Sequence, residues 1–422
     1  MIFLRDYVVL LAAVLLAGAS LSLPSAFADP ECASYNDGTI DVECDASIAD
    51  IDRGISNDDV LNSNGDEWVL DATIVVQDGA TLSIDGSDVS WLKIAGDNGI
   101  IVDGELEVNG VMITSWDKDD RDMIDQNSDG SVERAFVRIR DSDRVVVTNS
   151  EFGYLGYADP GKRGFDVFGE PSSNIEIRGS EFHNMWMAFY SREASNVTID
   201  NNEYHHNIKY ALDPHSGTFN VTVTNNHLHH NPIGVICSGD CYNILIEGNE
   251  VNNNTGVGIF LSRNMHDSIV RNNVLYNENV GIVLAESPDN EVYSNKVEAS
   301  STGVFLFNPE NPDDGETENN RIWNNSITGA EFGIHASRSH DNVLENNQLS
   351  DIKSSEYLLT ADSSFEIRNQ NFNNTGISGD SMTNIVEISD SGIIQVDSDR
   401  HDTGRSSFET ELNDDSITVN SR

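Results

Sequence analysis

Short runs of alternating apolar and polar residues fill much of the chain, and Gly, Asp and Asn residues separate them. In the N-terminal part these runs predict strands at 70–76, 81–84, 99–102 and 106–108. The preceding stretch, 29–60, is polar and loop-like. Because no segment has the long 3.6-residue apolar period of an amphipathic helix, we expect an all-β protein.

From about residue 135 the pattern repeats, and Asn residues mark the turns of the repeat. These turns are Asn202, Asn226, Asn249, Asn273 and Asn295, extended backwards by Ser180 and Ser150 and forwards by Asn325 and Asn347. The five central turns are separated by 24, 23, 24 and 22 residues. We interpret 159–171 and 308–318 as insertions. Three short strands per unit are typical of one coil of a right-handed parallel β-helix, in which a column of Asn sets the register.

The two ends of the chain differ from the repeat. Residues 1–28 predict an export signal, with Arg5 before the apolar run 8–17 and small residues at Ala26 and Ala28. That run is too short to span a membrane comfortably. We expect an N-terminal cap with the first strands at 29–134, the β-helix at 135–390 and a polar tail at 391–422. The mature chain is then expected outside the cytoplasm, as a monomer without a membrane span.

The formal charge of −47 narrows the choice of partners. It argues against nucleic acid, because the phosphates would be repelled, and it suits a highly soluble surface. A polyanionic substrate would need cations inside its site, where screening over about 8 Å isolates it from the remaining charge. Four cysteines in an exported chain suggest two disulfides, and proximity favours Cys32–Cys44 and Cys237–Cys241.

An acidic stretch before the repeat has the spacing of a calcium loop. Oxygen-bearing side chains alternate and Gly130 stands at the sixth position, as in the first half of such a loop. The candidate ligands are Asp125, Asn127, Asp129 and Ser131. Phe136 occupies the twelfth position, where a bidentate Glu is usual. The stretch is therefore either a structural calcium site or an acidic turn.

The segment 209–215 departs from the repeat. Neighbouring units carry small or apolar residues where this unit has Asp213, followed by Pro214 and His215. Lys209 and Tyr210 add an ammonium and a phenol. An acid, an imidazole, a phenol and an ammonium within one segment are enough for proton-transfer chemistry, and a scaffold that breaks its own pattern at one unit is expected to do so for function.

Three pieces of the sequence resemble the mannuronan C-5 epimerases. Residues 210–215, Tyr-Ala-Leu-Asp-Pro-His, are similar to the family's Tyr-Gly-x-Asp-Pro-His signature. Residues 150–157 are similar to its Leu-Gly-Tyr segment, and the coils at 220–297 have a similar length and turn pattern. Residues 258–263 resemble the Gly-Ile-Ile-x-Ser-Arg segment of the periplasmic members, one coil later than in those proteins. The resemblance covers about half of the chain.

The resemblance implies a reaction at C-5 of a uronate in an acidic polysaccharide, without an organic cofactor. A base removes the C-5 proton and a second group returns a proton to the opposite face. His215 can act as base or acid near neutral pH. Tyr210 can serve the other face if a nearby cation lowers its pKa, and Asp213 would orient the imidazole or the sugar. The cations expected to neutralise the uronate are Lys209, Arg192 and Arg263.

Three other functions stay open from the sequence. A polysaccharide lyase begins with the same proton abstraction but expels the group at C-4. A non-catalytic β-helix would bind carbohydrate at a surface. A metal-handling protein is the third, because His205-His206 and His229-His230 lie 24 residues apart and are expected to stack on adjacent coils; a polar ladder at a turn explains the same spacing.

Overall fold

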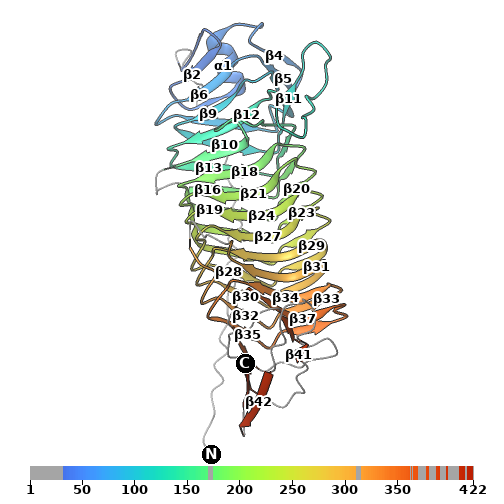
Figure 1. The fold of residues 1–422 in the computed structure, drawn as a ribbon. Helices are drawn as coiled ribbons and strands as arrows, with labels where there is room; N and C mark the ends of the chain where they lie inside the picture. The colour runs from blue at the N-terminus through green and yellow to red at the C-terminus, as the bar shows by residue number, and fades with distance from the viewer. Residues whose placement is uncertain are drawn as a thin grey trace, which may run out of the picture.

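The chain forms an elongated stack of coils along one axis, coloured from blue at its N-terminal end to orange in the later coils (Figure 1). In this computed structural model, residues 32–169, 174–309, 315–361, 363 and 365–368 are described, together with the strands β39 to β43 beyond them. The expected export signal, 1–28, lies outside the described residues, and the expected polar tail, 391–422, is described only in its strands.

Three stacks of parallel strands form the three faces of the rod. The first face contains β3 (Ala46–Ser47), β7 (Thr81–Asp85), β10 (Glu105–Asn109), β13 (Arg144–Thr148), β16 (Asn174–Arg178), β19 (Ser195–Asp200), β22 (Phe219–Thr224), β25 (Tyr242–Glu247), β28 (Ile269–Arg271), β30 (Glu291–Tyr293), β32 (Arg321–Trp323), β35 (Asn342–Glu345), β38 (Phe365–Arg368) and β40 (Val386–Ser389). The second face contains β5 (Glu67–Leu70), β8 (Trp91–Ala95), β11 (Met112–Trp116), β14 (Glu151–Gly153), β17 (Glu181–His183), β20 (Glu203–His205), β23 (His227–His229), β26 (Glu250–Asn252), the first parts of β29 (Val274–Ala285) and β31 (Lys296–Phe307), β33 (Ser326–Thr328) and β36 (Gln348–Ser350).

The third face follows each strand of the second face around a corner. It contains β2 (Thr39–Val42), β6 (Thr73–Val76), β9 (Gly99–Val102), β12 (Phe136–Arg140), β15 (Gly164–Phe168), β18 (Met187–Arg192), β21 (Tyr210–His215), β24 (Ile233–Ser238), β27 (Val257–Ser262), the second parts of β29 and β31, β34 (Phe332–Ser337), β37 (Ser355–Thr360), β39 (Ile377–Gly379) and β41 (Val396–Asp397). One coil thus supplies one strand to each face, and each strand pairs with its equivalents in the coils before and after it. The expected strands at 81–84, 99–102 and 106–108 correspond to β7, β9 and β10 and already belong to these stacks.

Antiparallel pairs and one helix lie at the ends of the stack. β1 (Ala33–Asn36) pairs with β2, β4 (Leu61–Asn64) with β5, and β42 (Phe408–Asn413) with β43 (Ser416–Ser421). The helix α1 (Ile48–Ile55) falls in the stretch expected to be loop-like, and that expectation was wrong. A capping box explains the helix. The side chain of Ser47 accepts a hydrogen bond from the backbone N–H of Asp50, and the carboxylate of Asp50 accepts one from the backbone N–H of Ser47. Within the described residues, no helix is long and apolar enough to cross a membrane.

A buried ladder of side-chain amides fixes the register of the coils. The Nδ2 of Asn226 donates to the carbonyl of Ile199 at 3.0 Å and to Oδ1 of Asn249 at 3.0 Å, and its backbone N–H donates to the same Oδ1 at 2.9 Å. The bond from the backbone N–H to a side-chain oxygen of the next coil recurs along the turns from Ser150 to Asn347, with the hydroxyl of Ser180 as the acceptor for Ser150. These are the residues that mark the repeat in the sequence, so the predicted Asn column and the parallel β-helix are confirmed.

Inward-facing side chains of all coils form one continuous apolar core. Aromatic rings stack within it from coil to coil: Phe152 lies 5.0 Å from Phe182, which lies 4.9 Å from Tyr204. Such a core leaves the outward positions of each strand free for polar side chains, and on the third face these positions carry the candidate chemistry.

The predicted disulfide Cys32–Cys44 is confirmed, with Cα atoms 5.3 Å apart. The predicted Cys237–Cys241 bridge is wrong, because both thiols are free and buried. Cys237 packs in the core from β24, whereas the thiol of Cys241 donates to the carbonyl of Ser238 at 3.4 Å. Both behave as small interior side chains, the usual role of a buried free cysteine.

Candidate active site

The strand β21 presents a phenol, a carboxyl group and an imidazole on the outside of the third face. Leu212 packs in the core, whereas Tyr210 joins a separate apolar cluster with Trp186 and Tyr190. Asp213 is only 2% exposed, and Tyr210 and His215 are partly buried. The Nδ1 of His215 lies 2.5 Å from Oγ of Ser216. The three groups expected from the sequence to carry the chemistry therefore lie on one strand and share one face.

The two preceding coils extend this outer surface in register. Asp166 of β15 pairs with Tyr190 of β18, which pairs with Asp213. Two residues further along β18 and β21, Arg192 pairs with His215. The rings of Tyr190 and His215 lie 5.6 Å apart, centroid to centroid. Residues far apart in sequence are thus placed side by side by the coil repeat.

Cations converge on Asp213 and His215. The guanidinium of Arg163 lies over the ring of Tyr190, with its central carbon 4.1 Å from the centroid, and the Nζ of Lys209 lies 5.0 Å from the centroid of Tyr210. Lys209, Arg163 and Arg263 each favour the charged form of Asp213, and all three with Arg192 oppose a positive charge on His215. The structure therefore brings together the expected cations Lys209, Arg192 and Arg263.

The three expected cations differ in exposure. Arg192 and Arg263 are exposed, and Arg192 forms an ion pair with Glu193 at 3.4 Å. Lys209 is partly buried over its aromatic neighbours. Lys209 is therefore held in place, whereas the two arginines can reorient toward a bound anion.

Burial sets the protonation states of the acidic groups. Burial raises the pKa of Asp213 to about 8, although Lys209, Arg163 and Arg263 pull it down. Burial also raises the pKa of Asp166 to about 7, against a hydrogen bond from the backbone N–H of Arg163 at 3.0 Å. Oδ1 of each carboxyl group is buried and has no hydrogen-bond partner among the described residues. Both groups therefore keep a free polar atom at the site.

The pKa values of His215 and Tyr210 are shifted in opposite directions. Burial lowers the pKa of His215 to about 4, and Arg263, Arg163, Arg192 and Lys209 lower it further. Burial and then Asp213 raise the pKa of Tyr210, and Arg263 offsets this only in part. The condition that a cation lowers the pKa of Tyr210 is therefore not met, because desolvation of the phenolate outweighs the nearby charge. At neutral pH the imidazole is free of a second proton and the phenol keeps its own.

Arg163, Asp166 and Tyr190 were missed from the sequence. Arg163 and Asp166 fall within the segment interpreted as an insertion, 159–171, yet part of that segment is the strand β15. The alternation in Gly-Phe-Asp-Val-Phe, residues 164–168, is the signal that would have identified a strand with an outward-facing acid. Tyr190 follows an apolar run and carries no such signal in the sequence.

The acidic loop uses its own polar groups to close its turns. The backbone N–H of Ser131 donates to Oδ1 of Asp129 at 3.1 Å, and Nδ2 of Asn127 lies 3.4 Å from Oγ of Ser131. Gly130 has a φ of 73°, as expected for the tight turn. Asp125 and Asp129 are exposed. Calcium binding by these four residues stays a prediction.

Comparison with known proteins shows which family model and which curated proteins this chain is similar to. A family model described as a right-handed β-helix region matches residues 118–273, 164–313, 212–372 and 270–401. The mannuronan C5-epimerase of Pseudomonas putida is 29% identical over 154 residues, which are 34% of this chain and 29% of that protein. The mannuronan C5-epimerase of Pseudomonas fluorescens is 28% identical over 126 residues, 28% of this chain and 24% of that protein. The chain thus spans less than a third of the length of these curated relatives.

The solved structure of the periplasmic alginate epimerase AlgG has the same fold. It aligns with a TM-score of 0.70 and 20% identity over 85% of each chain. The predicted handedness of the coil is confirmed by this fold and by the family model. Because the family model covers more than half of the residues, the chain belongs to the right-handed β-helix family.

Proposed function

We propose that this protein is an extracytoplasmic enzyme that inverts C-5 of uronate residues within an acidic polysaccharide, converting mannuronate to guluronate. The observation that carries the proposal is the convergence of Tyr210, Asp213 and His215 with several cations on the third face. The similarity of part of the chain to mannuronan C5-epimerases and the shared fold with a periplasmic alginate epimerase support it. The disulfide Cys32–Cys44 supports an oxidising compartment.

Cations are the first requirement of this chemistry. A uronate carries a negative charge, and removal of the C-5 proton moves a second negative charge into its carboxylate. Arg163, Lys209 and Arg263 each act to lower the pKa of Asp213, in a chain whose formal charge is −47. Fixed positive charges aimed at the place where charge develops stabilise the transition state more than the ground state. We propose that these cations hold the substrate carboxylate against the third face.

The pKa shifts support one assignment of the two proton-transfer roles. His215, whose pKa is lowered to about 4, is neutral at pH 7 and can accept the C-5 proton. Tyr210, whose pKa is raised, keeps its proton and can donate it to the opposite face of the planar intermediate. The protonated imidazole and the phenolate then exchange their protons with water before the next turnover.

Asp213 has a third role in this proposal. With a pKa of about 8 the carboxyl group is mainly protonated at neutral pH, so it does not repel the substrate carboxylate. Its buried Oδ1 has no hydrogen-bond partner among the described residues and is free to bond to the sugar. A neutral carboxyl group in this position would orient the uronate by hydrogen bonding.

A product analysis distinguishes the proposed reaction from its alternatives. The purified protein is incubated with polymannuronate, and the polymer is examined by proton NMR. Guluronate residues without chain cleavage are expected. Unsaturated sugar ends would instead identify a lyase, and an unchanged polymer that still binds the protein would identify a binding module.

The pH dependence of kcat/KM is expected to follow the two shifted pKa values. Activity should persist far below pH 6.5 and fall only near pH 4, where His215 takes up a proton. It should also fall above about pH 8, where Asp213 ionises beside the substrate carboxylate. Initial rates between about pH 3 and about pH 9, roughly one unit beyond each limb, test both limbs. A single acid limb near 6.5 would contradict the role given to His215.

The same shift of His215 affects stability. Between pH 6.5 and about 4 the imidazole of the unfolded chain binds a proton and that of the folded chain does not. The unfolded state then binds more protons, so the contribution of His215 to the free energy of unfolding decreases as the pH falls through this interval.

A further inference from the structure

A ladder of acids and imidazoles runs along the second face, around the corner from the candidate active site. The strands β14, β17, β20, β23 and β26 stack in register, so their first and third residues form two columns. The first column contains Glu151, Glu181, Glu203, His227 and Glu250. The second column contains Gly153, His183, His205, His229 and Asn252. We call these two columns the Glu–His ladder.

Each imidazole of the ladder pairs with the acid of the preceding coil. The Nε2 of His205 lies 2.8 Å from Oε1 of Glu181, and that of His229 lies 2.9 Å from Oε1 of Glu203. His183 pairs in the same way at 3.0 Å. One acid and one imidazole per rung make a repeated polar contact between coils, and this part of the ladder needs no ligand.

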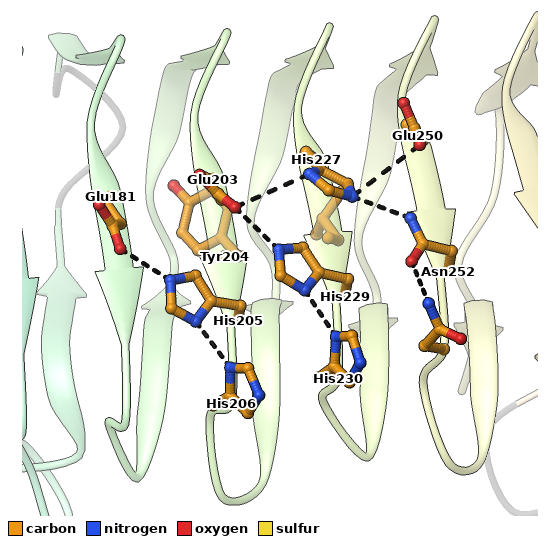
Figure 2. A network of polar contacts seen from close by, with 12 residues as sticks. Glu181, Glu203, Tyr204, His205, His206, His227, His229, His230, Glu250 and Asn252 are labelled. Carbon is orange, nitrogen blue, oxygen red and sulfur yellow. Dashed lines mark hydrogen bonds and ion pairs between the residues drawn. The ribbon is translucent and has the colours of Figure 1, made fainter.

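The first column of the ladder contains His227 at a position where its other members are glutamates, as Figure 2 shows. Glu203 therefore faces two imidazoles. Its Oε1 lies 2.9 Å from Nε2 of His229 and 3.8 Å from Nδ1 of His227, and the two rings lie 4.2 Å apart, centroid to centroid. One donor atom from each of the three side chains lies within 4.8 Å of the other two. All three side chains reach the surface, where His227 is 41% exposed.

We propose that Glu203, His227 and His229 bind a divalent transition metal of the zinc class. Two imidazole nitrogens and one carboxylate oxygen form a donor set that such ions prefer, whereas calcium takes oxygen ligands only. Ligand atoms bound at about 2.0–2.1 Å around a tetrahedral ion lie about 3.3 Å from one another, between the two distances found here. The metal would replace the proton now shared by Glu203 and His229. Three protein ligands leave the fourth position open to solvent.

The surroundings of this cluster hold its rings in place. The Nδ1 of His229 lies 2.7 Å from Nδ1 of His230, so that ring is already oriented through its other nitrogen. The Nε2 of His227 accepts from Nδ2 of Asn252 at 2.8 Å and lies 4.0 Å from Oε1 of Glu250, and this arrangement turns Nδ1 toward Glu203. A metal on Nδ1 would place the ring proton on Nε2, where the carboxylate of Glu250, not the amide nitrogen of Asn252, can accept it. Partners that orient a ligating imidazole through its second nitrogen are a regular part of metal sites. The neighbouring carboxylate of Glu250 also favours a cation here.

The histidine pairs singled out from the sequence play a different part. His206 and His230 are exposed and stack on adjacent coils with centroids 4.9 Å apart, and each contacts the Nδ1 of the histidine before it. Within the described ranges, no carboxylate joins this stacked pair to form a group of three candidate ligands. The metal site is therefore assigned to the extra imidazole of His227 and its two partners.

Zinc binding by the full chain without an affinity tag tests the proposal. Calorimetric titration with zinc chloride is carried out with calcium in excess, which occupies the many surface carboxylates. Wild-type protein is expected to bind one equivalent, and His227→Gln and Glu203→Gln are each expected to weaken binding at least about tenfold. Glu181→Gln is the matched control, because it removes a ladder acid of similar exposure that faces a single imidazole, and it should bind as wild type.

Cobalt(II) substitution provides an independent readout. A tetrahedral site with imidazole ligands gives intense visible absorption, which should be present in the wild type and in Glu181→Gln and be absent from His227→Gln. The exposed position of His227 keeps that variant folded, as circular dichroism will verify. Equal zinc affinity in wild type and His227→Gln, or a weak six-coordinate cobalt spectrum in the wild type, would overturn the proposal.

Discussion

Replacing His215 with glutamine is expected to lower kcat for C-5 inversion by about 10²- to 10⁴-fold, the range that a positioned general base contributes. The amide cannot accept the C-5 proton, whereas the cations that hold the uronate carboxylate remain. KM for polymannuronate is therefore expected to change little. Rates of guluronate formation, followed by NMR at several polymer concentrations, separate the two parameters.

The matched control for this variant is His266→Gln. His266 is also a partly buried histidine, but it stacks on Tyr242 at 5.4 Å on the first face. Its replacement should leave both kinetic parameters unchanged. A His215→Gln enzyme with the wild-type kcat would show that another group removes the proton, whereas equal loss in both variants would indicate damage to the fold.

Replacing Asn249 with alanine is expected to lower the free energy of unfolding by about 2–6 kcal/mol, because two buried backbone groups lose their partners at about 1–3 kcal/mol each. Its Nδ2 donates to the carbonyl of Val223 at 2.9 Å, and its Oδ1 accepts from the backbone N–H and Nδ2 of Asn226 at 2.9 and 3.0 Å. Water cannot reach these groups, since Asn249 is 1% exposed. Urea unfolding monitored by circular dichroism measures the change.

Asn279→Ala is the control for the ladder variant. Asn279 is exposed on a neighbouring coil, and within the described part of the chain its Oδ1 accepts only a 3.4 Å contact from Ser300. Its loss should change the free energy of unfolding by less than about 0.5 kcal/mol, as is usual at the surface. If the two variants were equally stable, the Asn column would not be what sets the register of the coils.

The repeat was readable from the sequence because one physical requirement recurs in every coil. A buried turn with unpaired backbone groups needs a small side chain that both donates and accepts, so Asn226 and its equivalents stand at nearly constant spacing. The outward groups of β21 were readable for the opposite reason. Asp213 departs from the pattern of the neighbouring units, and an acid that is only 2% exposed is costly unless it serves a function.

Features that depend on contacts between distant residues were not readable. Arg163 and Asp166 join the site only because β15 stacks two coils before β21, and an interruption of the repeat hid that strand. The spacing of Cys237 and Cys241 alone predicted a disulfide, yet both thiols are free and buried in the interior. The raised pKa of Tyr210 follows from burial by neighbouring coils, which no local pattern indicates.

The most direct test of the proposed reaction is hydrogen exchange at C-5. Polymannuronate is incubated with the wild-type protein in deuterium oxide, and the product is examined by NMR and mass spectrometry. The account predicts one deuterium at C-5 of every guluronate residue formed, in a polymer of unchanged length, because Tyr210 exchanges its proton with solvent before donating it. Polymannuronate recovered without deuterium and without inversion, or cleaved to unsaturated ends, would contradict it.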